Sequence, residues 1–272
     1  MTAPAESAEL KSCCAAVYQS DLARMLLGDS FHPGGQRLTA RLGEQLGLGP
    51  GVRVLDVASG KGESAIFLAR QFGCQVAGVD FGAQNVREAN YNAATAQVTH
   101  LVSFIEGDAE RLNLSDADFD AVICECAFCT FPDKCAAASE FARILRPEGR
   151  LGMSDLTRQG ALARDLEGLL AWIACIAAAR PVEEYAGYLE EAGFDVATIE
   201  SHNNALAETA HDVQGRLLGI EIMVKLKKLD LPGADFEQAQ RLARAAANAI
   251  QQGLLGYSLI VAQLRIRESE CF

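Results

Sequence analysis

Short apolar runs alternate with longer segments of helical periodicity along most of the chain. The runs are rich in β-branched residues and too brief for helices, which indicates buried strands of a parallel sheet. The longer segments repeat apolar residues at intervals of three and four, which indicates helices packed on such a sheet. Strands are predicted at 52–57, 75–79, 101–106, 119–123, 150–154, 193–200 and 256–265. This pattern predicts an α/β fold with a seven-stranded, Rossmann-like sheet.

Helices are predicted before, between and after these strands. They cover residues 11–27, 36–46, 63–72, 132–145, 160–180, 181–192, 205–229 and 234–252. The apolar segment 160–180 contains Arg164, Asp165 and Glu167. These charges favour a helix that covers the sheet over one that spans a membrane.

The composition narrows the range of partners. Half of the residues are hydrophobic, the formal net charge is -12, and Lys and Arg form no long run. Nucleic-acid binding normally needs a basic patch, so neither DNA nor RNA is an expected partner. The first eleven residues lack the features of a signal peptide, and nine cysteines suit a reducing compartment. We expect a cytoplasmic monomer that contacts no membrane.

A turn of small residues follows the first strand, where Val52–Gly62 has the sequence VRVLDVASGKG. Small residues let the backbone turn sharply and approach a ligand, and the helix that follows offers free N–H groups. The next strand ends at Asp80, twenty positions after Gly60, where a carboxylate can accept hydrogen bonds from both ribose hydroxyls. The third strand ends near Asp108, which can meet an adenine amino group.

The ordered set DVASGKG, VD at 79–80 and GDA at 107–109 resembles the class I S-adenosylmethionine (SAM) methyltransferases. LRPEGRLGMSD at 145–155 is similar to methyltransferases of the ubiquinone-biosynthesis type. The resemblance implies SAM as the cofactor, a last strand antiparallel to the sixth, and a helical insertion before that last strand. It assigns cofactor binding to Asp56, Ala58, Ser59, Gly60, Gly62, Asp80, Phe81, Asp108, Ala109, Glu125 and Tyr18.

We therefore expect a single SAM-dependent methyltransferase domain over residues 1–272. Its parts are an N-terminal lid segment (1–48), a SAM-binding core (49–155), and substrate-covering helices with the end of the sheet (156–272). In this family the segment before the first strand commonly lies over the cofactor. Tyr18 and the loop His32–Gly35 are therefore candidate lids for the methionine end of SAM. Alternatively, Tyr18 packs in the core and the loop caps the next helix.

Cysteines from three distant places are predicted near the acceptor. Cys126 follows the fourth strand, at the edge where an open α/β sheet presents substrates, while Cys175 and the pair Cys13–Cys14 lie in segments that can cover it. Three thiolates suit a trivalent arsenic atom, whose lone pair stays free to attack the methyl group of SAM. The alternative for each cysteine is a small buried hydrophobe, which is the role expected of Cys74, Cys124 and Cys135.

Two segments resemble the arsenite methyltransferases: VICECAFCTFPDK at 122–134 and WIACIAAARPVEEYAGYLEEAGF at 172–194. The resemblance assigns arsenic binding to Cys126, Cys175 and either Cys14 or Cys13. The implied substrate is a trivalent arsenical, free or conjugated to a thiol. Glu125 stands where an amide is expected in that family, and the last seventy residues match no part of it. Glu125 is a candidate general base, a partner of the cofactor amine, or a structural residue.

Two other functions compete with arsenic methylation. The first is methylation of a small organic O-, N- or C-nucleophile, with Glu125 and the inserted helices shaping an apolar pocket and the cysteines serving as core. The second is a non-catalytic sensor that binds arsenite or another soft metal through its thiols and keeps SAM as a structural ligand.

Overall fold

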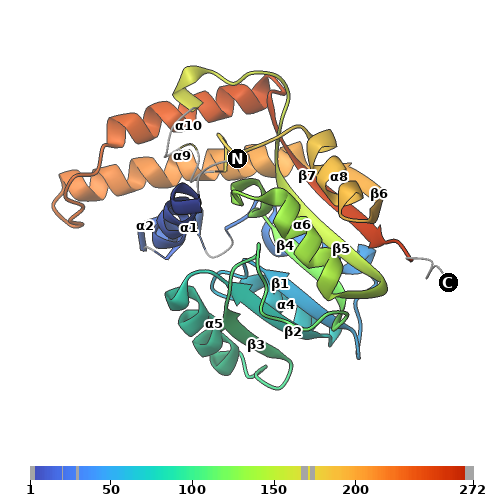
Figure 1. Ribbon diagram of the computed structural model, residues 1–272. Coiled ribbons are helices and arrows are strands. Elements are labelled where there is room, and N and C mark those ends of the chain that lie inside the picture. Colours follow the sequence, from blue (N-terminus) through green and yellow to red (C-terminus); the bar gives the residue numbers. More distant parts are fainter. Residues whose placement is uncertain (1–3, 20, 29–30, 167–170, 172–174, 267–272) are drawn as a thin grey trace.

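A single mixed sheet of seven strands organises the molecule, which we describe from a computed structural model for residues 4–19, 21–28, 31–166, 171 and 175–266 (Figure 1). The strands are β1 (Arg53–Val57), β2 (Gln75–Asp80), β3 (Val102–Glu106), β4 (Phe119–Glu125), β5 (Leu145–Arg158), β6 (Phe194–Ser201) and β7 (Leu255–Leu264). Their order is β3-β2-β1-β4-β5-β7-β6, and β7 pairs antiparallel with both β5 and β6. The predicted fold class is confirmed.

Helices cover both faces of this sheet. The α-helices of the described residues are α1 (Pro4–Tyr18), α2 (Asp21–Leu27), α3 (Gly35–Gln45), α4 (Glu63–Phe72), α5 (Ala83–Thr95), α6 (Lys134–Ile144), α8 (Val182–Glu191), α9 (Asn203–Lys225) and α10 (Phe236–Gln251). One buried cluster joins the sheet to α6 and α8 through Phe141 and Leu189. A second cluster joins it to α3, α4 and α5 through Leu42, Leu68 and Ala89. Successive residues of β1, such as Val54 and Leu55, belong to opposite clusters, as the pleat of a strand requires.

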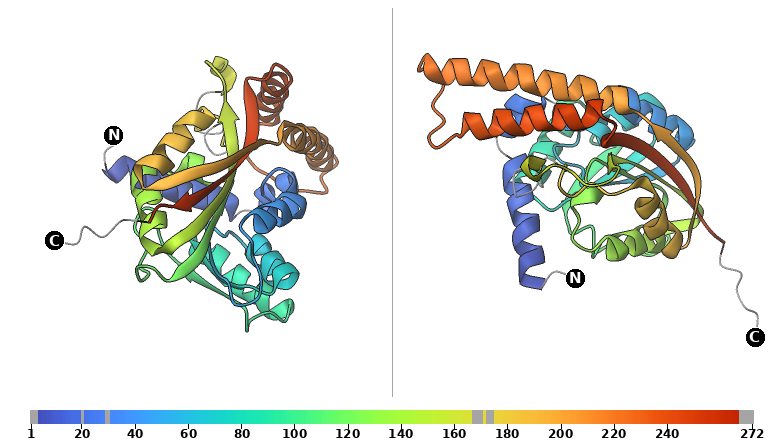
Figure 2. Two further views of the ribbon diagram at one scale, coloured as in Figure 1. Left: turned by 90° about the vertical axis from the view of Figure 1, so that its right-hand side faces the viewer. Right: turned by 90° about the horizontal axis from the view of Figure 1, so that it is seen from above.

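The inserted helices α9 and α10 run side by side and project beyond the sheet (Figure 2). They lie between β6 and β7, which confirms the predicted helical insertion. Helix α2 packs against α9, so the N-terminal helices and the insertion lie on the same side of the molecule. No helix among the described residues has both the length and the apolar character needed to cross a membrane.

Several predicted boundaries were wrong. The helix predicted over 11–27 is two helices, α1 and α2, because the chain leaves helical geometry after Tyr18. Strand β5 continues to Arg158 because β7 pairs with it up to that residue. Helix α5 was not predicted, since its buried face carries the small or polar residues Asn85, Ala89 and Ala93 rather than large apolar ones.

The helix predicted over 160–180 is also wrong at both ends. Residues 160–163 are irregular, Arg164–Leu166 form a short 3-10 helix, and 175–178 form a turn. The turn brings Arg180 back beside Thr157 of β5, which a straight helix would prevent. Residues 167–170 and 172–174, in the middle of the prediction, lie outside the described residues.

Candidate active site

A cavity opens at the carboxyl ends of β1, β2 and β4, beside the turn that follows β1. Ala58, Gly60 and Gly62 all have positive φ, at 59°, 53° and 83°. A Cβ atom at Gly62 would lie 2.5 Å from Cζ of Phe104, so this position requires glycine. Of the residues predicted to bind the cofactor, all except Gly62 line the cavity.

Asp80 holds this turn in place. Its Oδ2 accepts a hydrogen bond from the Gly60 N–H at 2.8 Å, and its Oδ1 accepts from Gly82 N–H at 2.8 Å and Asn85 Nδ2 at 3.0 Å. Burial raises the pKa of the Asp80 carboxyl, although these hydrogen bonds oppose the shift. Asp80 therefore lines the cavity as an oriented acceptor, at the position predicted for ribose recognition.

Three buried polar atoms around the cavity have no hydrogen-bond partner within the described protein: Asp56 Oδ2, Ser59 Oγ and Asn85 Oδ1. An unsatisfied buried polar atom costs about 1–3 kcal/mol, so a polar ligand that bonds to such atoms fits this wall. Burial, together with the charges of Glu125 and Asp80, raises the pKa of the Asp56 carboxyl well above its ordinary value. These acidic groups suit a cationic ligand such as SAM, which carries a sulfonium and an ammonium group.

Glu125, at the end of β4, joins three parts of the chain. Its carboxylate accepts hydrogen bonds from Ser64 Oγ at 2.6 Å and from Thr39 Oγ1 at 3.1 and 3.2 Å. His32 Nε2 lies 3.7 Å from Glu125 Oε2, and both residues line the cavity. The loop before α3 therefore reaches the cavity through His32, while Gly34 of the same loop caps α3.

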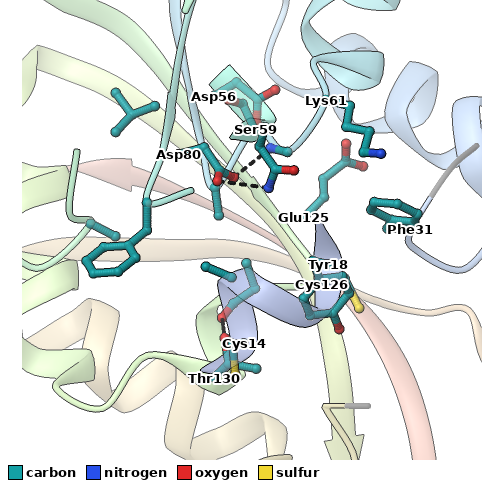
Figure 3. Close-up of a pocket in the computed structure, with 18 of the residues that line it drawn as sticks. Cys14, Tyr18, Phe31, Asp56, Ser59, Lys61, Asp80, Glu125, Cys126 and Thr130 are labelled. Atoms are coloured by element: carbon teal, nitrogen blue, oxygen red, sulfur yellow. Dashed lines mark hydrogen bonds between the residues drawn. The ribbon is translucent and has the colours of Figure 1, made fainter. Parts of the chain in front are cut away.

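Helix α1 supplies one wall of the cavity with Lys11, Cys14, Ala15 and Tyr18. The Tyr18 ring lies 5.9 Å from the Phe31 ring, and its hydroxyl oxygen lies 3.6 Å from Cys175 Sγ. Figure 3 shows Cys14, Tyr18, Cys126 and Thr130 gathered on one side of the cavity, and Asp56, Ser59 and Asp80 on the other. Tyr18 thus lines the cavity, and its role as a lid over the cofactor stays a prediction.

The structure brings two of the predicted thiols together. Cys126, directly after β4, lines the cavity with φ of 53°, and Cys175 is buried with its Sγ 3.5 Å from the Cys126 carbonyl oxygen. The side chain of Cys126, then those of Cys129 and Tyr18, hydrogen-bond to Cys175 and hold the pKa of its thiol well below the usual value. Cys129 was not predicted to take part.

The N-terminal pair is divided, because Cys14 lines the cavity and Cys13 is not among the lining residues. Among the residues that the structure describes, no three His, Cys, Asp or Glu side chains are already grouped to hold a metal ion. The arsenic ligand set of Cys126, Cys175 and Cys14 therefore stays a prediction.

Three cysteines were predicted to be buried in the core, and one of them is not. Cys74 and Cys124 are buried, as expected, whereas Cys135 is exposed. Cys135 lies in the first turn of α6, next to the N-terminal end that Asp133 caps, and it points away from the buried face of that helix. Its burial was therefore wrongly predicted.

Sequence reasoning also missed four residues that line the cavity and one, Thr39, that contacts it through Glu125; the four are Lys11, Ser64, Asn85 and Phe131. Lys11 and Tyr18 are seven positions apart, which is the spacing of one helical face, and this signal points to Lys11 once Tyr18 is a candidate. Nothing in the local pattern brings Thr39 to Glu125, since these residues meet only through the packing of α3 beside the sheet.

Comparison with known proteins places the chain in a family. The family model described as "Methyltransferase domain" matches residues 48–211, more than half of the chain. The chain is 32% identical over 196 residues to the 27-O-demethylrifamycin SV methyltransferase of Amycolatopsis mediterranei, covering 66% of this chain and 72% of that protein. It is 30% identical over 155 residues to an arsenite methyltransferase of Halobacterium salinarum, covering 56% of this chain and 39% of that protein.

The fold is shared with a solved structure of Haemonchus contortus phosphoethanolamine N-methyltransferase 2, in complex with phosphomonomethylethanolamine and S-adenosylhomocysteine. The TM-score is 0.79 at 17% identity, over 94% of this chain and 60% of the other. The shared fold agrees with the matched family model, and the chain belongs to the methyltransferase domain family.

Proposed function

We propose that this SAM-dependent methyltransferase transfers the methyl group to a trivalent arsenic atom held by cysteine thiolates. The observation that carries the proposal is that the buried Cys175, whose Sγ lies 3.5 Å from the Cys126 carbonyl oxygen, packs directly behind Cys126, which lines the cavity. Hydrogen bonds from the neighbouring thiols lower the pKa of Cys175, and the same contact with Cys175 raises the pKa of Cys126, so the cluster favours one thiolate at Cys175 as the group that binds a soft acceptor. Cys14, on the cavity face of α1, is the proposed third ligand.

SAM supplies an electrophilic methyl group next to this thiol cluster. Asp80 and Asp108 line the end of the cavity that we assign to the ribose and adenine, and Asp56 and Glu125 line the part that we assign to the methionine. Cys126 and Cys175 would hold the arsenic so that its lone pair points at the methyl carbon. The As–C bond forms as the S–C bond breaks, and S-adenosylhomocysteine is the leaving group. No general base is needed, so the residues act by holding and orienting the reactants.

The test is methyl transfer from labelled SAM to arsenite, to methylarsenite and to no acceptor, with reduced glutathione present. We expect methylated arsenic from the wild-type protein. Cys126→Ser should lose at least about a hundredfold in rate, because positioning of the acceptor is lost, while SAM binding is kept. Cys135→Ser is the matched control, since Cys135 is exposed on α6. Wild-type turnover in Cys126→Ser, or no arsenic product from the wild type, would overturn the proposal.

A second candidate is O-methylation of a small organic hydroxyl compound. It is favoured by the His32–Glu125 pair in the cavity, since an imidazole beside a carboxylate can accept the hydroxyl proton. The similarity to a rifamycin methyltransferase supports the same class of acceptor. In the assay above, His32→Asn should leave arsenic methylation nearly unchanged. With a phenolic or alcoholic acceptor it should instead abolish turnover, while Cys126→Ser should have little effect.

A further inference from the structure

One face of helix α1 lines the cavity over two helical turns. Lys11, Cys14, Ala15 and Tyr18 are spaced at i, i+3, i+4 and i+7, and all four line the cavity. A helix rises 1.5 Å per residue, so Lys11 and Tyr18 are roughly 10 Å apart along its axis. Lys11 meets Asp108, whereas Tyr18 meets Cys175. A single rigid element therefore touches both the end assigned to adenine and the end assigned to the acceptor.

Two carboxylates bind the side-chain amine of Lys11. Its Nζ lies 2.7 Å from Asp108 Oδ2 and 3.0 Å from Asp108 Oδ1, and it also bonds to Glu110 Oε2. The Lys11 and Glu110 side chains are only 14% and 12% exposed. Burial opposes the charge on Lys11, but the two carboxylates outweigh it and raise the pKa of the amine. The pair is thus a shielded ion pair rather than a loose surface contact.

The two carboxylates have different relations to the cavity. Asp108 lines it, while Glu110 is not among the lining residues and accepts the Asp133 N–H through Oε1 at 2.8 Å. Asp108 Oδ1 also accepts the Glu110 N–H at 3.0 Å. Lys11 therefore ties α1 to a carboxylate that faces the cofactor and to a second one fixed against the start of α6. Lys11 is the only basic residue in Pro4–Tyr18, so nothing else in α1 can replace this contact.

We propose that Lys11 is a positioning residue that fastens α1 over bound SAM. Its ion pair orients Asp108 for the adenine amino group, and through the same helix it sets the positions of Cys14 and Tyr18 at the acceptor end. Affinity for SAM and closure of the acceptor end thus depend on one contact. The inference rests on the SAM site and holds whether the acceptor is an arsenical or an organic molecule.

The first measurement is SAM binding by calorimetry with no acceptor present, so that failure of the arsenic proposal does not affect it. Lys11→Met should weaken SAM binding about tenfold, since a shielded charge-assisted contact is lost. Lys11→Arg, which keeps the charge and the reach, should restore most of the affinity. Glu110→Gln should weaken binding by a smaller factor although Glu110 does not line the cavity, because it keeps an acceptor for Asp133 N–H and loses only the charge.

The second measurement separates positioning from a general loss of folding. In Lys11→Met, amide hydrogen exchange should rise in α1 and stay unchanged in β1 and β4. The KM for SAM should rise and kcat should fall as well, because Cys14 and Tyr18 lose their positions at the acceptor end. Lys225→Met is the control, because the exposed Lys225 forms its ion pair with Glu221 on α9, and neither residue lines the cavity. Wild-type affinity and wild-type exchange of α1 in Lys11→Met would overturn the proposal. So would an equal loss of kcat and kcat/KM that Lys11→Arg fails to rescue.

Discussion

The carboxylate of Asp155 is buried beside the thiol cluster and bonds to the backbone of Cys129. Oδ2 accepts the Cys129 N–H and Oδ1 accepts the Leu156 N–H, both at 2.8 Å. Burial, and next the charge of Cys175, raise its pKa from 3.8 to about 7 despite these hydrogen bonds. The protonation of Asp155 is therefore coupled to the charge of Cys175.

This shift makes stability depend on pH in a defined window. Between about pH 4 and pH 7 the unfolded chain releases the Asp155 proton while the folded chain keeps it, so the folded state loses stability as pH rises. The loss amounts to about 4 kcal/mol at most and is complete above about pH 7. Asp155→Asn should remove this contribution. Urea denaturation at pH 4.5, 6 and 7.5 should show the advantage of the wild type over the variant shrinking with pH. A constant difference would contradict the prediction.

At the scale of elements, the turn between β1 and α4 combines backbone strain with close packing. Gly62 has φ of 83°, and an added Cβ would also lie 3.1 Å from the Ala89 Cβ in α5. Helix α5 and the ring of Phe104 on β3 therefore fix how closely the turn can pack on the sheet. The position of the first N–H groups of α4 follows from that packing.

Gly62→Ala should lower the free energy of unfolding by about 3 kcal/mol, through positive φ and a clash with Phe104 together. Gly51→Ala is the matched control, because Gly51 has φ of 86° and no atom within 4 Å of the added Cβ. It should cost about 1 kcal/mol from backbone strain alone. Equal losses for the two variants in urea denaturation would mean that the packing against Phe104 contributes nothing.

The order of the strands explains which site residues were predictable from the sequence. The positions of Asp80 and Asp108 follow from strand order, because the carboxyl ends of parallel strands share one edge of the sheet. The contact of Lys11 with Asp108 joins residues 97 positions apart, and no local pattern encodes it. The region around Cys175 was predicted as helix from its apolar composition, yet tertiary packing turns the chain there to bring Arg180 to β5. Local periodicity thus predicts the sheet, while the positions of α1 and of the segment around Cys175 depend on long-range contacts.

At the scale of the whole molecule, the cofactor cavity lies between parts of the chain that are far apart in sequence. Helix α1, the loop before α3, the β1 turn and the segment after β4 all line it. Among the described residues around the cavity, Asp56, Ser59 and Asn85 have buried polar atoms without hydrogen-bond partners, and the charges of Glu125 and Asp80 raise the pKa of Asp56. A cationic ligand that bonds to them relieves this cost only in the folded state. Binding should therefore stabilise the protein as a unit.

SAM at a hundredfold excess over its dissociation constant should raise the free energy of unfolding by about 2.7 kcal/mol. NAD, which lacks the sulfonium and ammonium charges that suit Asp56 and Glu125, should give no increase at the same concentration. Asp80→Ala should lose most of the SAM-dependent increase, because it removes both the proposed ribose acceptor and the contact that orients Gly60. Thermal denaturation with and without each ligand measures the effect. Stabilisation by NAD equal to that by SAM would show that the cavity recognises adenosine alone, and the acidic wall would then have no part in choosing the cofactor.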